Sequence, residues 1–448
     1  MRLLIALTLT VASATSLAAD MIAVSAAERH ALAPELALAP GGDVAVIWLD
    51  REPQKAATPG PVDAATVAAP EHTPMQHAAG APDRHTSSMD LWFARSSDGI
   101  TFAAPVRVNP EPGMVWGFAV SKPKMAIARS GTIHVIFPAN DIHTASGKTT
   151  LGMYYTRSTD AGRSFEAPRH LHQMPDVDQS QFMDGGFTSA HAFGALGVAP
   201  DGAVHAVWVD TRTMKSGDTA AAAYSAVSTD DGRSFTAEQV ALDSGVCPCC
   251  QLTVAFDARS NMYLGSRLVT HDGYRNSSVV RIGAGANKTG KRVQVGGAAW
   301  KLEGCPLKPT VIAVDGAQVY ATAYNGGEAS PGVYFSASDD GGAHFATAMA
   351  VHPGATVSDA PAMVIANGLP VIAWHGKTTG GKRVFWRTAV RGGRSFGPVQ
   401  ELPAPPGAAQ SAALATRPDG RVQIVWQQGE QIYTTALSTQ SLRSGSKP

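Results

Sequence analysis

The four cysteines are the residues of this sequence with the widest choice of chemistry. Three lie in a C-P-C-C run that contains Cys247, Cys249 and Cys250, and Cys305 follows in a G-C-P run. Cysteine sulfur forms disulfides in oxidising compartments, binds soft metals as thiolate, or cycles as a redox-active thiol pair. One such disulfide would join Cys247 to Cys305. The adjacent Cys249 and Cys250 cannot easily bond to each other without strain, so at least one of them needs another partner.

Histidine and methionine residues share the connections predicted near these cysteines. Met174 closely follows His170 and His172, and most of the 14 histidines fall in such connections. Imidazole and thioether ligands together suit copper better than Mg²⁺ or Ca²⁺. The alternative interpretation is a set of scattered surface histidines. The predicted ligands of a copper or zinc site are Cys247, Cys249, Cys250, Cys305, His170, His172 and Met174.

A second set of residues suits the chemistry of glycoside hydrolysis. Several predicted strands end in a carboxylate, and arginines follow two of these carboxylates directly or after one residue. A glycoside hydrolase needs a carboxylic acid near the scissile bond, and arginines grip anionic sugars. The other interpretation is that these aspartates cap strand ends and hold loops. The catalytic candidates are Asp50, Arg51, Asp141, Asp210, Arg212 and Tyr324.

A repeated segment indicates which elements must position these residues. S-T-D-A-G-R-S-F at 158–165 returns as S-T-D-D-G-R-S-F at 228–235, with related copies at 96–102, 338–345 and 389–396. The Asp can accept hydrogen bonds from nearby backbone N–H groups, the Gly can adopt a positive φ, and the Phe can pack on a sheet. These properties describe a tight β-hairpin. Its recurrence predicts an array of similar β units.

Seven such units can be traced along the chain, each beginning with a pair of apolar strands around a Gly or Asn turn. The seventh unit lacks a fourth strand, and the isolated strand at 21–25 can supply it. That exchange closes a ring of sheets and removes the exposed edge of an open array. We therefore predict an all-β protein, a seven-bladed β-propeller of four-stranded antiparallel blades. A six-bladed propeller is the alternative.

Strand direction alternates within each blade, so the connections divide between two faces. The repeated hairpins and the short Gly or Asn turns fall on one face, and the long connections fall on the other. Cys247 and Cys305 precede the first strands of adjacent units, so we expect their sulfurs to lie side by side on the second face. Because loops on a rigid scaffold usually carry the functional residues, we place the site on this face.

The repeated S-x-D-x-G-x-[ST]-[FW] frame resembles the Asp-box of the sialidase superfamily, and the resemblance covers nearly the whole mature chain. It implies a propeller whose Asp-boxes lie opposite the active site. It also implies three arginines on a substrate carboxylate, a Tyr nucleophile assisted by Glu, and an Asp acid/base. This chain departs from the family because A-P-E-L at 33–36 stands where an Arg-Ile-Pro signature is expected. The resemblance is therefore to a non-canonical member, and Tyr324 with Glu303 or Glu328 is the candidate pair.

Composition and the termini set the remaining expectations. The formal net charge is zero and 16% of residues are charged, so nothing favours nucleic-acid binding. Residues 1–19 are typical of a secretory signal peptide, which predicts a periplasmic or extracellular protein without a transmembrane segment in the mature chain. We expect the propeller over 20–438, with a flexible insertion at 52–88, and a disordered tail at 439–448. We also expect a monomer.

These observations lead to three functional hypotheses. The first is a secreted propeller that binds a ligand or partner on its Cys, His and Met face, with copper or another soft metal as a possible ligand. The second is an exo-acting glycoside hydrolase of sialidase type. The third is an envelope scaffold that docks another protein. A small molecule, a glycan or an envelope protein is thus the expected partner.

Overall fold

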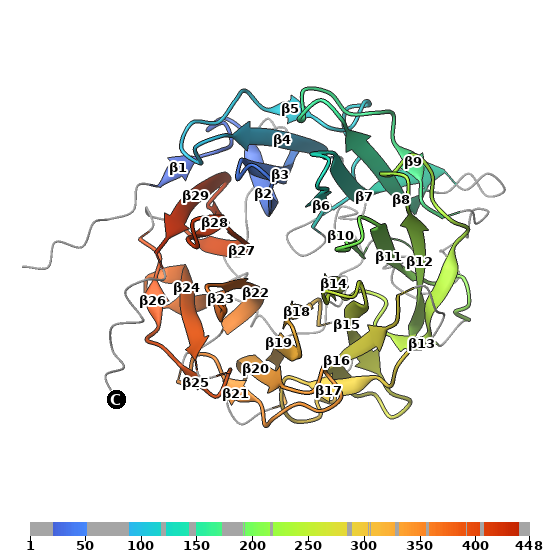
Figure 1. The fold of residues 1–448 in the computed structure, drawn as a ribbon, viewed down its shortest axis with the longest axis vertical. Helices are drawn as coiled ribbons and strands as arrows, with labels where there is room; N and C mark the ends of the chain where they lie inside the picture. Colours follow the sequence, from blue (N-terminus) through green and yellow to red (C-terminus); the bar gives the residue numbers. More distant parts are fainter. Residues whose placement is uncertain are drawn as a thin grey trace, which may run out of the picture.

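Every regular element of the described chain is a β-strand. The computed structural model describes residues 21–51, 89–117, 122–142, 149–172, 191, 193–215, 218–284, 289–302, 304, 306–327, 331–354, 358–390, 392–403 and 407–438. Antiparallel sheets of four strands stand around a common axis, as in a β-propeller (Figure 1). The predicted signal peptide 1–19, insertion 52–88 and tail 439–448 lie outside the described residues. The all-β propeller of four-stranded antiparallel sheets is confirmed.

Each sheet is a meander from an inner strand to an outer one (Figure 1). The inner strands are β2 (His30–Leu38), β6 (Lys124–Ile127), β10 (Gly194–Val198), β14 (Thr253–Phe256), β18 (Thr310–Asp315), β22 (Ser358–Ala366) and β27 (Ala409–Thr416). The second strands are β3 (Val44–Arg51), β7 (Ile133–Ile142), β11 (Val204–Asp210), β15 (Met262–Val269), β19 (Gln318–Asn325), β23 (Leu369–Thr378) and β28 (Val422–Gln428).

The outer half of each sheet follows the same order. The third strands are β4 (Asp90–Ser96), β8 (Thr149–Ser158), β12 (Ala221–Ser228), β16 (Arg275–Ile282), β20 (Gly332–Ser338), β24 (Gly381–Val390) and β29 (Gln431–Leu437). The outermost strands are β5 (Val106–Arg107), β9 (Arg169–His170), β13 (Gln239–Val246), β17 (Val293–Val295), β21 (Met349–Ala350), β25 (Ser395–Phe396), β26 (Gln400–Glu401) and β1 (Ile22–Ala23).

The number of blades depends on how one junction is counted. The sheet that contains β10 to β13 continues into the sheet that contains β14 to β17. The single residue pair Val246↔Leu268, between β13 and β15, makes this link. If this sheet is counted as two blades joined by one residue pair, the ring has seven blades. The count of seven stays a prediction.

The ring closes with strands from both ends of the described chain. β1 pairs antiparallel with β29, through Ile22↔Thr434 and Ala23↔Tyr433. The backbone N–H of Val24 donates to Ile432 O at 2.8 Å and extends the same ladder. The prediction that the isolated strand at 21–25 completes the last sheet is confirmed. The closure covers the edge of β29, which would otherwise present unpaired backbone groups.

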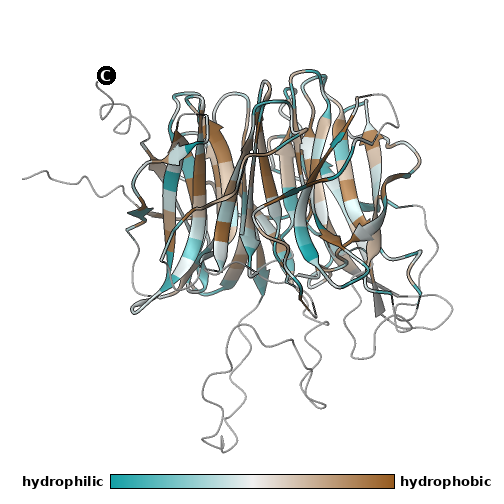
Figure 2. Ribbon diagram, turned by 90° about the horizontal axis from the view of Figure 1, so that it is seen from below, coloured by the Kyte–Doolittle hydropathy of each residue, from teal (hydrophilic) through white to brown (hydrophobic). Residues whose placement is uncertain are grey.

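Apolar side chains between neighbouring sheets hold the ring together. Four second strands carry a tryptophan in the same register, and all four are at most 1% exposed: Trp48, Trp208, Trp374 and Trp426. A buried aromatic side chain removes about 150–250 Å² from water, so each is a large contribution to packing between blades. In the edge-on view of Figure 2 the strands run roughly along the ring axis, with apolar segments through the middle of the sheets.

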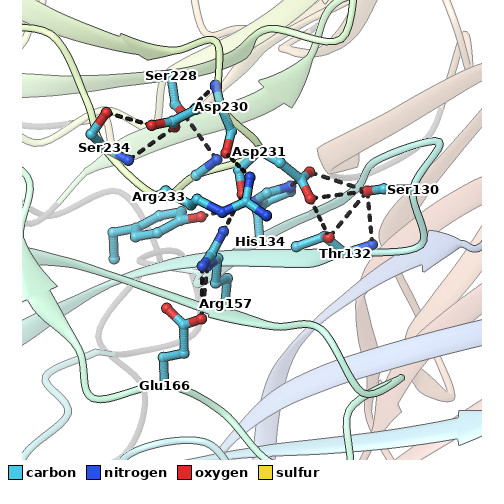
Figure 3. Close-up of polar contacts among 12 residues, drawn as sticks. Ser130, Thr132, His134, Arg157, Glu166, Ser228, Asp230, Asp231, Arg233 and Ser234 are labelled. Atoms are coloured by element: carbon cyan, nitrogen blue, oxygen red, sulfur yellow. Dashed lines mark hydrogen bonds and ion pairs between the residues drawn. The ribbon is translucent and has the colours of Figure 1, made fainter.

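The Asp-box hairpins fold as the sequence predicts. In the copy at 228–235, the Asp230 carboxylate accepts hydrogen bonds from the Ser234 N–H at 2.9 Å and the Ser234 hydroxyl at 2.6 Å (Figure 3). The N–H of Gly232 donates to Ser228 Oγ at 2.8 Å, and Gly232 adopts a φ of 79°. These bonds fix the loop without help from another blade, which explains why the segment recurs almost unchanged.

The neighbouring residue of the same hairpin joins two blades. The Asp231 carboxylate accepts a hydrogen bond from Thr132 Oγ1 at 2.6 Å, and its carbonyl accepts one from Arg157 at 2.6 Å (Figure 3). Thr132 and Arg157 belong to the preceding blade, whose β8 also supplies Tyr155. A Cβ on Gly232 would lie 1.8 Å from the Tyr155 hydroxyl oxygen, so this glycine is also a point of close contact between blades.

Candidate functional site

Cys247, Cys249 and Cys250 lie on the face opposite the Asp-box hairpins. β13 begins after the hairpin at 228–235, crosses the sheet antiparallel to β12, and ends at Val246 directly before Cys247. This position agrees with the expectation for Cys247, Cys249 and Cys250. Cys305 lies outside the described residues, so its predicted place beside Cys247 stays a prediction.

A tight turn gathers the three described cysteines. The N–H of Cys250 points to Cys247 O at 3.4 Å, with Pro248 at the second position of the turn, where its fixed φ is favourable. The N–H of Cys247 donates to Arg267 O at 2.9 Å and ties the turn to β15. The three sulfurs lie within 4.8 Å of one another, and none of the three residues is more than 1% exposed.

Cys247 and Cys250 carry free thiols whose Sγ atoms are 2.6 Å apart. The disulfide between Cys247 and Cys305 that the sequence allowed is therefore wrong. The turn explains the correction, because it brings Cys247 against a cysteine three residues away in the same loop. This spacing was visible in the C-P-C-C run, but sequence reasoning compared cysteines on different blades instead.

Two buried arginines flank the thiol pair. Arg275 Nη1 lies 3.9 Å from Cys247 Sγ, and Arg267, only 1% exposed, donates to Arg275 O at 2.7 Å and Tyr324 O at 3.0 Å. Among the described residues no carboxylate forms an ion pair with Arg267 or Arg275. A buried cation without an anionic partner is costly. A thiolate at Cys247 is the anion best placed to offset this cost.

The two thiols differ in acidity for physical reasons. Burial opposes ionisation of Cys247, but the hydrogen bond from Cys250 and the charge of Arg275 outweigh it and lower the pKa of Cys247 to about 7. Burial and the neighbouring sulfur of Cys247 raise the pKa of Cys250 well above its usual value. Cys247 is therefore the more acidic thiol of the pair.

The donor set fits a soft metal ion, with one geometric condition. Thiolates select Cu(I) or Zn²⁺, and a Cu(I) ion between two thiolates forms an anionic complex that Arg267 and Arg275 would complement. Two sulfurs bound tetrahedrally at about 2.3 Å from a metal stand roughly 3.8 Å apart. The side chains of Cys247 and Cys250 must therefore separate from their 2.6 Å contact to accommodate an ion.

A charged cluster borders the thiols at the next blades. The backbone N–H of Lys308 points to the Cys250 sulfur, and the Lys308 ammonium forms an ion pair with Asp359. Burial opposes ionisation of Asp359, but the charge of Lys308 and hydrogen bonds from Lys308 and the Ala360 N–H keep its pKa below the usual value. Burial lowers the pKa of His375 to about 4, so this ring stays neutral at neutral pH.

The predicted metal-binding histidines belong to a different cluster. The rings of His170 and His172 have centroids 5.0 Å apart, and His172 stacks on His191 at 4.0 Å. In the described part of the chain, the one group of three possible metal ligands is the cysteine trio, which includes no histidine. Of this trio only Cys247 and Cys250 carry free thiols, so Cys249 is not available as a thiolate ligand. Met174 lies outside the described residues. A site that joins His170, His172 and Met174 to the cysteines stays a prediction.

Two of the candidate aspartates are buried and engaged in ion pairs. Asp50 is 2% exposed and accepts a hydrogen bond from Arg29 at 2.6 Å, while burial raises its pKa. Asp210 is fully buried, and burial opposes its ionisation. Hydrogen bonds from His191 and Arg212 outweigh that effect and hold the pKa of Asp210 below its usual value. Asp141 lies on β7, and its side chain is not among the described ones.

The candidate arginines and the candidate tyrosine lie in different environments. Arg212 is bound to Asp210 at 2.7 Å and to Glu238 at 2.5 Å, and its guanidinium lies 3.9 Å from the centroid of the Tyr224 ring. Arg51 is the exposed last residue of β3. Burial raises the pKa of Tyr324 to about 12, so its phenol stays protonated at neutral pH. Glu303 and Glu328, its proposed partners, lie outside the described residues.

Sequence reasoning missed the two arginines beside the thiols. Arg267 interrupts the apolar run of β15, and Arg275 opens β16. A charged residue at a position that the strand pattern buries was the available signal, because Arg is rarely fully buried without a partner.

Comparison with known proteins identifies the fold more clearly than the function. No family model matches the sequence, and no curated protein matches it. Among solved structures, a Hadza microbial sialidase is similar with a TM-score of 0.50 and 13% identity, over 92% of this chain and 66% of that chain. The fold is sialidase-like.

Two further structures share this fold. A protein of unknown function from Dyadobacter fermentans has a TM-score of 0.52 and 16% identity, over 82% of this chain and 97% of that chain. An ulvan lyase, from a new family of polysaccharide lyase, has a TM-score of 0.53 and 11% identity, over 94% of this chain and 99% of that chain. At identities this low, the similarity indicates the fold alone, and the chemistry must be inferred from the residues of the site. Within the described residues, no helix has the length and apolar character needed to cross a membrane.

Proposed function

We propose that this chain is a secreted, sialidase-like propeller that binds a soft metal ion, Cu(I), through Cys247 and Cys250. The observation that carries the proposal is a pair of free, buried thiols beside two arginines that have no carboxylate partner in the described chain. Zn²⁺ is the alternative ion, although it prefers four ligands. Export through the signal peptide 1–19 and further ligands from His170, His172 and Met174 belong to the same proposal.

The site is better suited to binding than to glycoside hydrolysis. Asp50 and Asp210 are buried, Arg212 is held by two carboxylates, and the Tyr324 phenol has a raised pKa. A sialidase needs arginines free to bind a substrate carboxylate and an activated nucleophile. The hydrolase remains the second hypothesis because of the shared fold. Release of a fluorophore from a fluorogenic sialoside, abolished by Arg51→Ala or Arg212→Ala, would favour it over metal binding.

The metal proposal is tested by anaerobic competition for Cu(I) against a coloured chelator. The reduced wild-type chain is expected to take one Cu(I) per molecule. Cys247→Ser and Cys250→Ser should each weaken binding by at least about 100-fold, since each removes one of the two ligands. His344→Ala, at an exposed position on the Asp-box face, is the matched control and should bind as the wild type does. Equal binding by the wild type and the Cys247→Ser variant would refute the proposal.

A further inference from the structure

The Cys247 and Cys250 pair has a geometry that suits reversible oxidation as well as metal binding. Its Sγ–Sγ separation of 2.6 Å lies between the disulfide bond length of about 2.05 Å and an ordinary non-bonded contact of roughly 3.5–4.0 Å. Both residues belong to one turn, closed by the N–H of Cys250 and the carbonyl of Cys247. A small movement of the two side chains is enough to bring the sulfurs to bonding distance.

The surroundings of the two sulfurs are unequal, which assigns them different roles. Arg275 Nη1 lies 3.9 Å from Cys247 Sγ, and Arg275 also donates to Thr219 O at 3.2 Å, which fixes the guanidinium in place. Cys250 instead faces the neutral backbone N–H of Lys308. Because the Arg275 guanidinium contacts the Cys247 sulfur, Cys247 is placed to attack and Cys250 to respond.

Burial limits the oxidants that reach the pair. Neither residue is more than 1% exposed, and the cysteines pack in an apolar cluster with Val246, Leu252 and Val269. A large disulfide such as oxidised glutathione cannot approach a sulfur in this position without opening the sheet. A hydroperoxide little larger than water requires far less space.

We propose that Cys247 and Cys250 form a redox-active dithiol that reduces small hydroperoxides. The Cys247 sulfur attacks one peroxide oxygen, the O–O bond breaks, and the other oxygen leaves as an alcohol or water after it takes up a proton. Cys247 is then a sulfenic acid. The Cys250 thiol attacks the Cys247 sulfur and loses its proton, and the hydroxyl departs as water. Two electrons pass from two thiols to one hydroperoxide, and a dithiol small enough to reach the buried disulfide restores the thiols.

The peroxide reaction does not depend on metal binding, although oxidation of the thiols would prevent metal binding. The disulfide has no thiolate, so oxidation would remove both proposed Cu(I) ligands at once. Failure of the Cu(I) titration would leave the peroxide reaction untouched, because the reaction is followed on protein stripped of metal by a chelator.

The test treats the reduced, chelator-stripped chain with one equivalent of hydrogen peroxide and maps the cysteines by mass spectrometry. The expected product is a Cys247–Cys250 linkage with a mass loss of two hydrogens, reversed by dithiothreitol. Cys250→Ser should stop at a sulfenic acid on Cys247 that dimedone traps. Cys247→Ser should give no such adduct. Its Cys250 thiol should be lost at least about 10-fold more slowly than the thiols of the wild type.

Two further variants separate chemistry from folding. Arg275→Gln should slow the loss of thiols, and Arg275→Lys should restore part of the rate, with near-identical circular dichroism spectra for all variants. Oxidised glutathione should react much more slowly with the folded chain than hydrogen peroxide does. The proposal is overturned if dimedone labels Cys250 instead, if the linkage joins other cysteines, or if oxidised glutathione reacts as fast as the peroxide.

Discussion

At the scale of single residues, unusual neighbours explain most of the distinctive positions in this protein. Arg267 and Arg275 are buried and form no ion pair with a carboxylate in the described chain, and the Cys247 sulfur lies 3.9 Å from Arg275 Nη1. A different constraint requires glycine at position 232. Gly232 combines a positive φ with contact against Tyr155 of the preceding blade.

Replacing Gly232 with Ala should destabilise the fold strongly. The new Cβ would meet the Tyr155 hydroxyl at 1.8 Å, so the blades must shift, and we expect a loss of about 3 kcal/mol or more in the free energy of unfolding. The matched control is Gly202→Ala, since Gly202 also has a positive φ of 92° but no atom within 4 Å of its added Cβ. That variant should lose only about 1–2 kcal/mol. Equal losses in denaturant titrations would contradict the close-contact role.

At the scale of elements, the Asp-box hairpin at 228–235 and the side chains beneath it hold one sheet to the preceding one. His134 of β7 is fully buried under the hairpin at 228–235, with its Nδ1 2.7 Å from the Tyr155 hydroxyl and its Nε2 3.5 Å from Asp231. Burial lowers the pKa of His134 to about 4. The contact between these two blades should therefore respond to pH.

Stability should fall as the pH drops from about 6.5, the usual pKa of an unfolded histidine, towards 4. The folded-state pKa of His134 is the lower one, so the unfolded chain binds more protons in this range and gains stability relative to the folded chain. The full effect is roughly 3 kcal/mol for this residue, and His375 adds to it in the same direction. Denaturant titrations between pH 7.5 and 4 measure this change in the free energy of unfolding.

The control for this prediction is a histidine on another Asp-box hairpin. His134→Gln should reduce the loss of stability on acidification, whereas His344→Gln, at an 89% exposed side chain, should leave the wild-type pH dependence nearly unchanged. If both variants followed the wild-type curve, burial of His134 would not be the source of the effect.

At the scale of the whole molecule, closure of the ring depends on a short strand from the beginning of the described chain. β1 contributes its backbone to β29, and the N–H of Ile432 donates to Ser25 Oγ at 2.9 Å. Every blade has two neighbours because of this pairing. The last sheet would otherwise carry an exposed edge.

A chain that begins at residue 26 should therefore be less stable and prone to associate. Loss of β1 uncovers the β29 edge, so we expect a lower melting temperature and self-association. A chain that begins at residue 21 keeps the strand and serves as the control. Calorimetry and size-exclusion chromatography compare the two. Matching melting temperatures and elution volumes would show that ring closure by β1 contributes little.

The sequence by itself determined the repeating architecture of this protein. Asp230, Gly232 and Ser234 bond within one hairpin, and alternating apolar residues mark the strands, so both patterns rest on contacts between residues close in the chain. The same alternation of strand direction placed the described cysteines opposite the Asp-boxes. Recognising that the strand at 21–25 lacked a partner was enough to anticipate ring closure.

Only the tertiary structure decided which residues make up the site. Arg267 and Arg275 stand on strands β15 and β16 and reach Cys247 through the packing of one sheet against the turn after another. The contact of buried Asp210 with His191, 19 residues earlier in the chain, likewise depends on how the loop before β10 packs on the blade. Contacts between residues distant in the chain follow from the shape of the assembled ring, and no local pattern encodes them.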